Sequence, residues 1–280
     1  MGKRSETDVA RQRWVLGEPR LPHLRRPMAR TAVLRRLKWH AARVLGVHDE
    51  TATARTICLE VRDWPGHVAG QHIDLRLRAR DGYTAVRSYS IASAPFSEGR
   101  IEITVERLPT GEVSPYLTQE LMVGDYLELR GPIGGWFVWR SGQTEPVQLI
   151  AGGSGIVPLM CMIRSRALAN STAPFRLLYS VREPGAIYYR AELEALSTRP
   201  PFVTTQYAFT RVAPNDWPRP SGRIDRDLIA SATWPASVGA TCYVCGPSGF
   251  VESVADLLCS AGNRQDKIKT ERFGPTGLPE

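Results

Sequence analysis

The spacing of apolar positions changes once along the chain, near residue 146. Between residues 38 and 140, short runs with alternating or β-branched residues are separated by turn sequences such as DWPG, RDG and SEG. This pattern predicts β-strands over residues 54–61, 71–77, 86–92, 100–108 and 125–131. Strands at such spacing favour a closed antiparallel barrel or a sandwich. A short helix is expected near Ser114, with Ser114 as its cap and Pro115 at its first position.

After residue 146, apolar strands alternate with helical periods. Strands are expected over 147–153, 175–181, 202–210 and 241–246, and helices over 156–169, 190–196, 225–230 and 250–262. This alternation predicts a parallel sheet covered by helices, a fold class of β-barrel followed by α/β domain. The polar segment RSGQTEP separates the two patterns. We therefore expect a basic, poorly ordered arm over 1–37, a barrel domain over 38–142 and an α/β domain over 143–280.

Length and charge agree with this division. A chain of 280 residues suits two domains of about 100–150 residues each. The net charge of +8 arises from residues 1–45, which hold 12 Lys and Arg and 3 Asp and Glu. Because the remainder is nearly neutral, the chain is not expected to bind nucleic acid. The arm is interpreted as a solvated terminus, with a tether for an acidic partner as the alternative.

The cysteine pattern and the apolar stretches bear on location. The 5 cysteines are odd in number and lie mostly in apolar runs, as is typical of reduced thiols in a cytoplasmic protein. Cys242 and Cys245 form a C-x-x-C pair inside an apolar strand without a second pair, so no metal site is expected. The longest apolar stretch, 149–163, is too short and too interrupted for stable membrane insertion. No signal peptide is recognised in the charged N-terminus.

Candidate chemistry in the second half lies where strands end. AGGSGIVP places Gly152, Gly153 and Gly155 between a strand and a helix, where backbone N–H groups can bind a pyrophosphate. A tight turn that binds nothing explains the same glycines. Cys245 ends another strand, beside a Gly-Pro turn. It is interpreted either as a buried structural cysteine or as a residue that contacts a reacting ring.

A possible nucleotide-phosphate site follows the second strand of this half. Ser180 and Arg182 lie at its carboxyl end, where a basic or hydroxyl residue can hold a ribose 2′-phosphate. The lack of an acid there favours NADPH over NADH. Tyr189 and Arg190 are candidates to complete the site, and a solvated loop charge is the alternative for Arg182.

Taken in order, these motifs resemble those of the ferredoxin–NADP⁺ reductase superfamily. RSYSIASAP (87–95) is similar to its R-x-Y-S flavin motif, and GEVSPYL (111–117) to its G-x-x-S pyrophosphate motif. GPIGGWF, AGGSGIVP, YSVR, YVCGP and TERFGPTG follow in the family's order. The resemblance covers residues 38–277 and implies a flavin-binding barrel followed by a nicotinamide-dinucleotide-binding α/β domain.

The resemblance also implies roles for single residues of the barrel. Arg87 would neutralise a flavin phosphate, Tyr89 would lie against the isoalloxazine ring, and Ser90 would offer its hydroxyl to flavin N5. Ser88 lies in the same cofactor-binding stretch without a defined role. The pyrophosphate-binding residues would be Gly111, Val113 and Ser114.

In the second domain, the resemblance implies a dinucleotide loop made of Gly152, Gly153, Ser154 and Gly155. Cys245, Gly246 and Pro247 would flank the nicotinamide, and Glu271 and Phe273 would close over the flavin side. Ser90, Cys245 and Glu271 are the predicted catalytic residues.

The predicted function is a flavoprotein oxidoreductase. Hydride would pass from NADPH or NADH to FAD, and electrons would leave to a separate acceptor, expected to be a protein such as a ferredoxin, since no iron–sulfur spacing is present. FAD is preferred to FMN because GEVS suits a pyrophosphate. The alternatives are a flavin or quinone reductase acting on a diffusing molecule, and a basic binding protein on a reductase-like fold.

Overall fold

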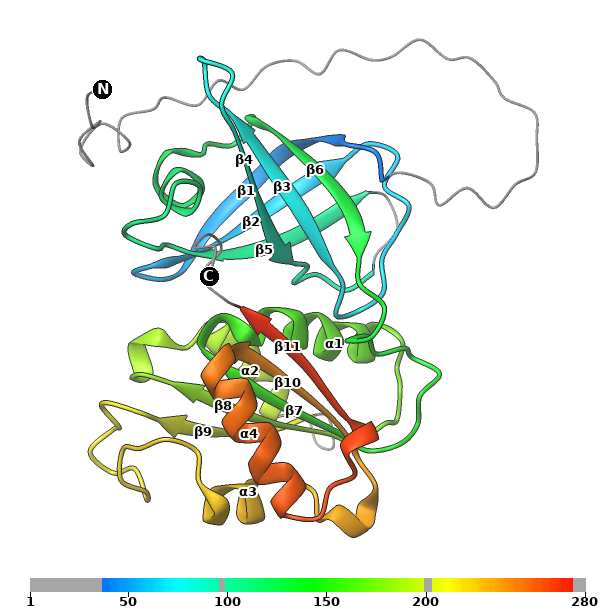
Figure 1. Cartoon of the computed structure of the whole chain (residues 1–280), viewed down its shortest axis with the longest axis vertical. Coiled ribbons are helices and arrows are strands. Elements are labelled where there is room, and N and C mark those ends of the chain that lie inside the picture. Colours follow the sequence, from blue (N-terminus) through cyan, green and yellow to red (C-terminus); the bar gives the residue numbers. More distant parts are fainter. Residues whose placement is uncertain (1–36, 96–98, 199–202, 274–280) are drawn as a thin grey trace, which may run out of the picture.

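Two sheets, one antiparallel and one parallel, organise the molecule in the computed structural model (Figure 1). The structure describes residues 37–95, 99–198 and 203–273. The predicted basic arm, residues 1–37, therefore lies almost wholly outside the described residues. The antiparallel sheet and the parallel sheet lie on either side of residues 140–146, where the sequence predicts the domain boundary.

The antiparallel sheet is a six-stranded barrel with strand order β4-β3-β6-β1-β2-β5. Its strands are β1 (His40–Thr51), β2 (Ala54–Val61), β3 (His72–Arg78), β4 (Thr84–Ser90), β5 (Arg100–Glu106) and β6 (Tyr126–Ile133). The two edge strands meet just beyond the end of β4, where Ile91 pairs with Ile103. There the Ala92 N–H donates to the Glu102 carbonyl at 2.7 Å. These contacts close the barrel directly after the RSYS motif.

The parallel sheet has the order β11-β10-β7-β8-β9. Its strands are β7 (Val147–Gly152), β8 (Phe175–Val181), β9 (Val203–Phe209), β10 (Thr241–Pro247) and β11 (Ile268–Phe273). The helices are α1 (Ile156–Leu168), α2 (Arg190–Ser197), α3 (Arg226–Ala232) and α4 (Ser248–Ser260). Residues of α1 and α2 pack on one face of the sheet, and residues of α3 and α4 on the other. Both faces are therefore covered, as a parallel sheet requires.

The core continues from one sheet to the other. Ala92, Phe137 and Trp139 of the barrel half belong to the same buried cluster as α1 and the inner face of the parallel sheet. The Trp139 ring meets the Phe175 ring edge to face, with centroids 5.3 Å apart. Figure 1 shows α1 between the barrel and the parallel sheet. The junction is thus packed like a core, which holds the two halves in one arrangement.

The predicted fold class is confirmed, with three local differences. The sequence pattern did not predict β1 or β11. The expected helix at Ser114 is a short π-helical turn, Tyr116–Glu120, whose first residues make no side-chain cap. The Ser114 hydroxyl instead accepts a hydrogen bond from the Leu108 backbone N–H at 3.0 Å. Ser114 therefore ties the preceding loop to the turn and does not cap the helix.

Candidate functional site

Strand β4 presents the three residues of the R-x-Y-S motif at the end of the barrel. Tyr89 packs against the barrel core, and burial raises the pKa of its phenol far above the ordinary value. Ser90 is buried, and its hydroxyl has no hydrogen-bond partner among the described residues. A buried hydroxyl left without a partner costs free energy, about 1–3 kcal/mol, unless a ligand satisfies it. Ser90 is therefore an open hydrogen-bonding position at the end of β4.

The three predicted catalytic residues come together from three distant segments. Glu271 of β11 lies opposite Cys245 of β10 in the parallel pairing. Burial raises the pKa of the Glu271 carboxyl to about 7, and the nearby Ser90 hydroxyl opposes this rise without forming a hydrogen bond of normal geometry. Burial, and then the Glu271 carboxylate, raise the pKa of the fully buried Cys245 thiol well above its usual range. A neutral thiol and a carboxyl that titrates near neutrality thus meet the barrel at Ser90.

The glycine loop crosses the carboxyl ends of β7 and β10. A Cβ on Gly155 would stand 2.1 Å from the Cys245 carbonyl oxygen, so no other residue fits there. A Cβ on Gly152 would stand 2.8 Å from the Phe250 ring. Gly153 has φ +54 and faces open space, with nothing within 4 Å of a Cβ built there. The loop therefore packs tightly against the sheet on one side and leaves its backbone accessible on the other, next to Ser154.

The G-x-x-S segment lies beside Arg87 and contributes an acid that the prediction missed. Val113 is buried in the barrel core. A Cβ on Gly111 would stand 2.9 Å from the Ser114 hydroxyl, so a larger residue here would displace that hydroxyl or the adjacent turn. Between them, Glu112 accepts from the Arg87 guanidinium at 3.0 Å. The charge of Arg87 is therefore shared with a carboxylate inside the predicted phosphate-binding segment.

The predicted 2′-phosphate residues do not all lie together. Ser180 is buried at the end of β8 and Arg182 is exposed just beyond it. Arg190 is exposed at the start of α2, and its guanidinium donates to the Pro184 carbonyl. Tyr189 does not fit the predicted phosphate role, because its side chain is only 4% exposed and contacts the barrel.

Tyr189 instead joins the two halves of the molecule. Its hydroxyl pairs with the Thr104 hydroxyl of β5, and its backbone N–H donates to the Glu50 carboxylate of β1 at 2.8 Å. Its φ of 54 lies in the left-handed region, which a residue with a Cβ adopts at a cost. The contacts from the barrel hold it there.

The remaining predicted residues have simpler surroundings. The Ser88 hydroxyl donates to Asp74 at 2.7 Å on β3, so it already has a partner. Gly246 packs against the Phe250 ring, where an added Cβ would stand 2.9 Å from a ring carbon. Pro247 is exposed and pairs in register with Phe273, which packs against the core at the junction.

These residues fit a flavin and a nicotinamide dinucleotide. The unpartnered Ser90 hydroxyl, the half-buried Tyr89 ring and the Arg87 guanidinium offer a donor, a flat face and a positive charge along one strand. The open backbone at Gly153 precedes a helix N-terminus, which favours a phosphate. The site lies at the point where the strand order reverses between β7 and β10, the usual ligand position in such sheets.

Comparisons with known proteins agree with this geometry. The family model described as "Oxidoreductase FAD-binding domain" matches residues 54–138, and "Oxidoreductase NAD-binding domain" matches residues 149–256. Together the two models cover most of residues 54–256, so the chain contains an FAD-binding and a NAD-binding oxidoreductase domain and belongs to the ferredoxin–NADP⁺ reductase superfamily.

Individual relatives support the same family. The glycine betaine monooxygenase reductase subunit of Chromohalobacter salexigens is 31% identical over 242 residues, 85% of this chain and 65% of that protein. The reductase component of the naphthalene 1,2-dioxygenase/salicylate 5-hydroxylase systems of a Ralstonia species is 31% identical over 197 residues, 69% of this chain and 57% of that protein. The chain thus spans less than two thirds of the length of either relative.

A solved structure shows the same fold. The ferredoxin NADP⁺ reductase of Neisseria gonorrhoeae, with bound FAD and NADP, superposes with a TM-score of 0.72 at 20% identity. The match covers 84% of this chain and 98% of that one. Separately, no helix within the described residues is long and apolar enough to cross a membrane.

Sequence reasoning missed the charged residues that organise the site. Glu112 stands inside the recognised GEVS motif, and its position between Gly111 and Val113, two of the predicted pyrophosphate-binding residues, was the available signal. Arg164 is a lone basic residue in the apolar stretch IVPLMCMIR, a pattern that indicates a buried partner for its charge. Its partners Glu102 and Glu192 carry no local signal, because they are distant in sequence.

Proposed function

We propose that this chain transfers hydride from NADPH or NADH to bound FAD and passes the electrons to a separate protein acceptor. The observation that carries the proposal is the meeting of Ser90, Cys245 and Glu271 where the barrel touches the parallel sheet. These residues belong to the flavin-binding strand and to the two strands beside the dinucleotide loop. Such an arrangement supports direct contact between the two cofactors.

Each residue then has a task set by its surroundings. Bound FAD supplies the group that accepts two electrons from the nicotinamide and releases them singly or together. With FAD bound, the Ser90 hydroxyl would donate the hydrogen bond that it lacks within the described residues, and the Tyr89 ring would offer its flat face to the cofactor. The neutral Cys245 thiol, at the end of β10 next to the glycine loop, would border the nicotinamide without adding charge. Glu271 holds a proton near Ser90 below about pH 7.

The preferred donor in this proposal is NADPH. Ser180, Arg182 and Arg190 lie near the end of β8 and the start of α2, and both arginines are exposed. A guanidinium binds a 2′-phosphate through two parallel hydrogen bonds, which NADH cannot provide. Tyr189 is left out of this site because it is buried against the barrel.

An exposed surface beside the site supports a protein acceptor with acidic charge. Trp136 is 62% exposed and has the Lys269 amine 5.5 Å from its ring centroid. Burial has the largest effect on the pKa of Lys269 and lowers it; Glu145 raises it, and Lys267 and Arg140 lie close enough to lower it further. Lys269 and Glu271 are two positions apart on β11, about 7 Å along the strand. The relatives named above are reductase components, which supports an oxygenase component or a ferredoxin as acceptor.

The acceptor is tested by stopped-flow mixing of the reduced protein with an acidic [2Fe–2S] ferredoxin and, separately, with free riboflavin. We expect faster transfer to the ferredoxin, with a rate that falls as salt is raised. Trp136→Ala should slow this transfer about tenfold and leave flavin reduction by NADPH unchanged. Met122→Ala, at another exposed apolar residue of the barrel half, is the matched control. Equal, salt-independent rates with both acceptors would contradict a docked protein.

A second candidate is a reductase that releases reduced flavin. The observation favouring it is the Arg87–Glu112 ion pair, because an arginine shared with a carboxylate holds a phosphate less firmly. Flavin retention through gel filtration distinguishes the two. A stable one-to-one complex supports the protein acceptor, and loss of flavin together with rapid reduction of added FMN supports the second candidate.

The cytoplasm is the proposed location. All five cysteines are free in the structure, including the exposed Cys259, as expected in a reducing compartment. Thiol titration of the freshly purified protein under denaturing, anaerobic conditions tests this, since fewer than five reactive thiols would indicate oxidation.

A further inference from the structure

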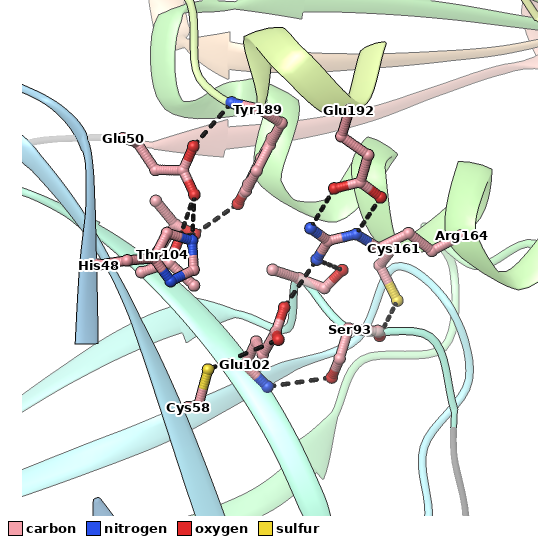
Figure 2. A network of polar contacts seen from close by, with 12 residues as sticks. His48, Glu50, Cys58, Ser93, Glu102, Thr104, Cys161, Arg164, Tyr189 and Glu192 are labelled. Atoms are coloured by element: carbon pink, nitrogen blue, oxygen red, sulfur yellow. Dashed lines mark hydrogen bonds and ion pairs between the residues drawn. The ribbon is translucent and has the colours of Figure 1, made fainter. Parts of the chain in front are cut away.

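Arg164 forms the centre of a polar network between α1 and the barrel (Figure 2). Its guanidinium makes a bidentate pair with Glu192 of α2, at 2.9 and 2.6 Å. The remaining terminal nitrogen donates to the Glu102 carboxylate at 2.8 Å and to the Ala92 carbonyl at 3.0 Å. The guanidinium also lies 5.0 Å from the centroid of the Tyr189 ring. One side chain therefore joins α1, α2, β5 and the segment that follows β4.

The charges of this network depend on Arg164. Its side chain is 19% exposed, and the two carboxylates that it binds, Glu102 and Glu192, face it from opposite sides of the junction. Burial by itself lowers the pKa of the Arg164 guanidinium, but the Glu192 and Glu102 carboxylates raise it above its usual value, so Arg164 stays charged. Without this cation, two partly buried carboxylates would face each other without compensation, and like charges at such sites repel.

The two ends of the network lead to the two halves of the site. Helix α1 begins at Ile156, directly after the glycine loop. Because Arg164 anchors this helix to the barrel, a change in the position of the helix would also move the loop. On the barrel side, Ala92 follows Ser90 by two residues, and its N–H donates to the Glu102 carbonyl at the closure of the barrel. Arg164 thus binds other atoms of the same two residues, Ala92 and Glu102, whose backbone hydrogen bond fixes the end of the flavin-binding strand.

A second contact runs beside the first. The Cys161 thiol, one turn earlier on the same face of α1, donates to the Ser93 carbonyl at 2.9 Å. The Ser93 hydroxyl in turn accepts from the Glu102 backbone N–H at 3.0 Å. Together, Cys161 and Arg164 bind consecutive carbonyl groups of the segment after β4, so α1 holds this segment at two points.

We propose that Arg164 is a positioning residue that sets the approach of the dinucleotide loop to the flavin-binding strand. This inference rests on the hydride transfer proposed above. Arg164 is not expected to touch either cofactor, so its loss should leave cofactor binding near normal while slowing the transfer. A misplacement of about 1 Å between reacting groups can cost about 100-fold in rate. We expect a 10- to 100-fold fall for Arg164→Met.

The test compares wild type, Arg164→Met, Arg164→Lys and a control in anaerobic stopped flow with saturating NADPH. The control is Arg166→Met, on the same helix, because the Arg166 guanidinium donates to the Ala173 carbonyl within the parallel-sheet half. Arg164→Met should slow flavin reduction, with flavin content and the nucleotide Kd changed less than threefold. Arg164→Lys, which keeps the charge but not the planar fork, should restore part of the rate. Arg166→Met should keep the wild-type rate.

A second measurement needs no cofactor. Hydrogen exchange of the flavin-free protein should show faster exchange of the Ala92 amide in Arg164→Met and unchanged exchange in Arg166→Met. The inference would be overturned if Arg164→Met showed the same rate of flavin reduction and the same Ala92 exchange as wild type. An equal loss of reduction rate in Arg164→Met and Arg166→Met would also overturn it. If wild type itself is not reduced by either nucleotide, the proposed function fails, and the exchange result still decides whether Arg164 holds the strand.

Discussion

The buried carboxyl of Glu271 gives the structure a pH dependence that can be measured without any cofactor. Burial raises its pKa from the ordinary 4.5 to about 7. Between these two values the carboxyl is protonated in the folded protein and ionised in the unfolded chain. Unfolding then releases a proton, so stability falls as the pH rises through this window. The Glu271→Gln variant cannot ionise at this position and should not show the fall.

The size of the effect follows from the two pKa values. The raised pKa of Glu271 lowers the free energy of unfolding by about 1.4 kcal/mol at pH 5.5 and by about 3.2 kcal/mol at pH 7.5. The difference in unfolding free energy between wild type and Glu271→Gln should therefore change by about 2 kcal/mol between these pH values. Any constant effect of the buried amide cancels in this comparison.

The assay is urea denaturation of flavin-free protein at several pH values from 5.5 to 7.5, followed by circular dichroism. Wild type should lose stability relative to Glu271→Gln as the pH rises. Glu60→Gln, at an exposed position of β2, is the matched control and should run parallel to wild type. A constant difference between wild type and Glu271→Gln across this range would refute the argument that burial at the junction holds the proton.

Three further predictions concern cofactor contacts. Arg87→Ala should weaken FAD binding by about 10- to 100-fold, the size of a lost charge-assisted hydrogen bond. A fluorescence titration measures this, with Arg80→Ala, at an exposed position, as control. An unchanged Kd for FAD would exclude a phosphate-binding role for Arg87. Cys245→Ala should slow flavin reduction about tenfold in stopped flow. Cys242→Ala, at an equally buried position on the other face of β10, should not slow it. Equal reduction rates in the two variants would leave Cys245 with a structural role only. Arg182→Ala should raise the KM for NADPH about tenfold and leave that for NADH unchanged, and equal changes would exclude a 2′-phosphate contact.

Elements with a clear periodicity were predictable, and the exceptions have physical causes. Strand β2 places its large apolar residues at every second position, at Ile57, Leu59 and Val61, and coincides with its predicted range, 54–61. Strand β1 was missed because it contains Gly46 and has register irregularities near Val44 and Thr51, which interrupt the alternation. Strand β11 was missed because it is a short edge strand whose partner, β10, precedes it across a helix. Its pairing depends on the assembled sheet and not on its own residues.

The site shows the same division between local and long-range information. Local motifs pointed to Ser90 and Cys245, and the structure brings both to Glu271. The placement of Tyr189 was not predictable, because its contacts with Thr104 and Glu50 form only when the barrel and the parallel sheet pack together. Spacing along the chain carries no information about that packing.

The predicted basic arm bears on the acceptor but lies almost wholly outside the described residues. Since β1 begins at His40, a truncation that tests the arm must end before this strand. Removal of residues 1–36 should leave flavin reduction unchanged. An unchanged, salt-insensitive transfer to acidic acceptors after this truncation would show that the arm takes no part in steering.

The central claim is that the barrel and the parallel sheet hold FAD and a nicotinamide dinucleotide in direct contact. The most direct measurement is anaerobic titration of the purified, FAD-loaded protein with NADPH and with NADH, followed by flavin absorbance. One equivalent of nucleotide should bleach the flavin completely, faster with NADPH, and Arg164→Met should reach the same end point more slowly. A flavin that binds but stays oxidised with both nucleotides would contradict the account.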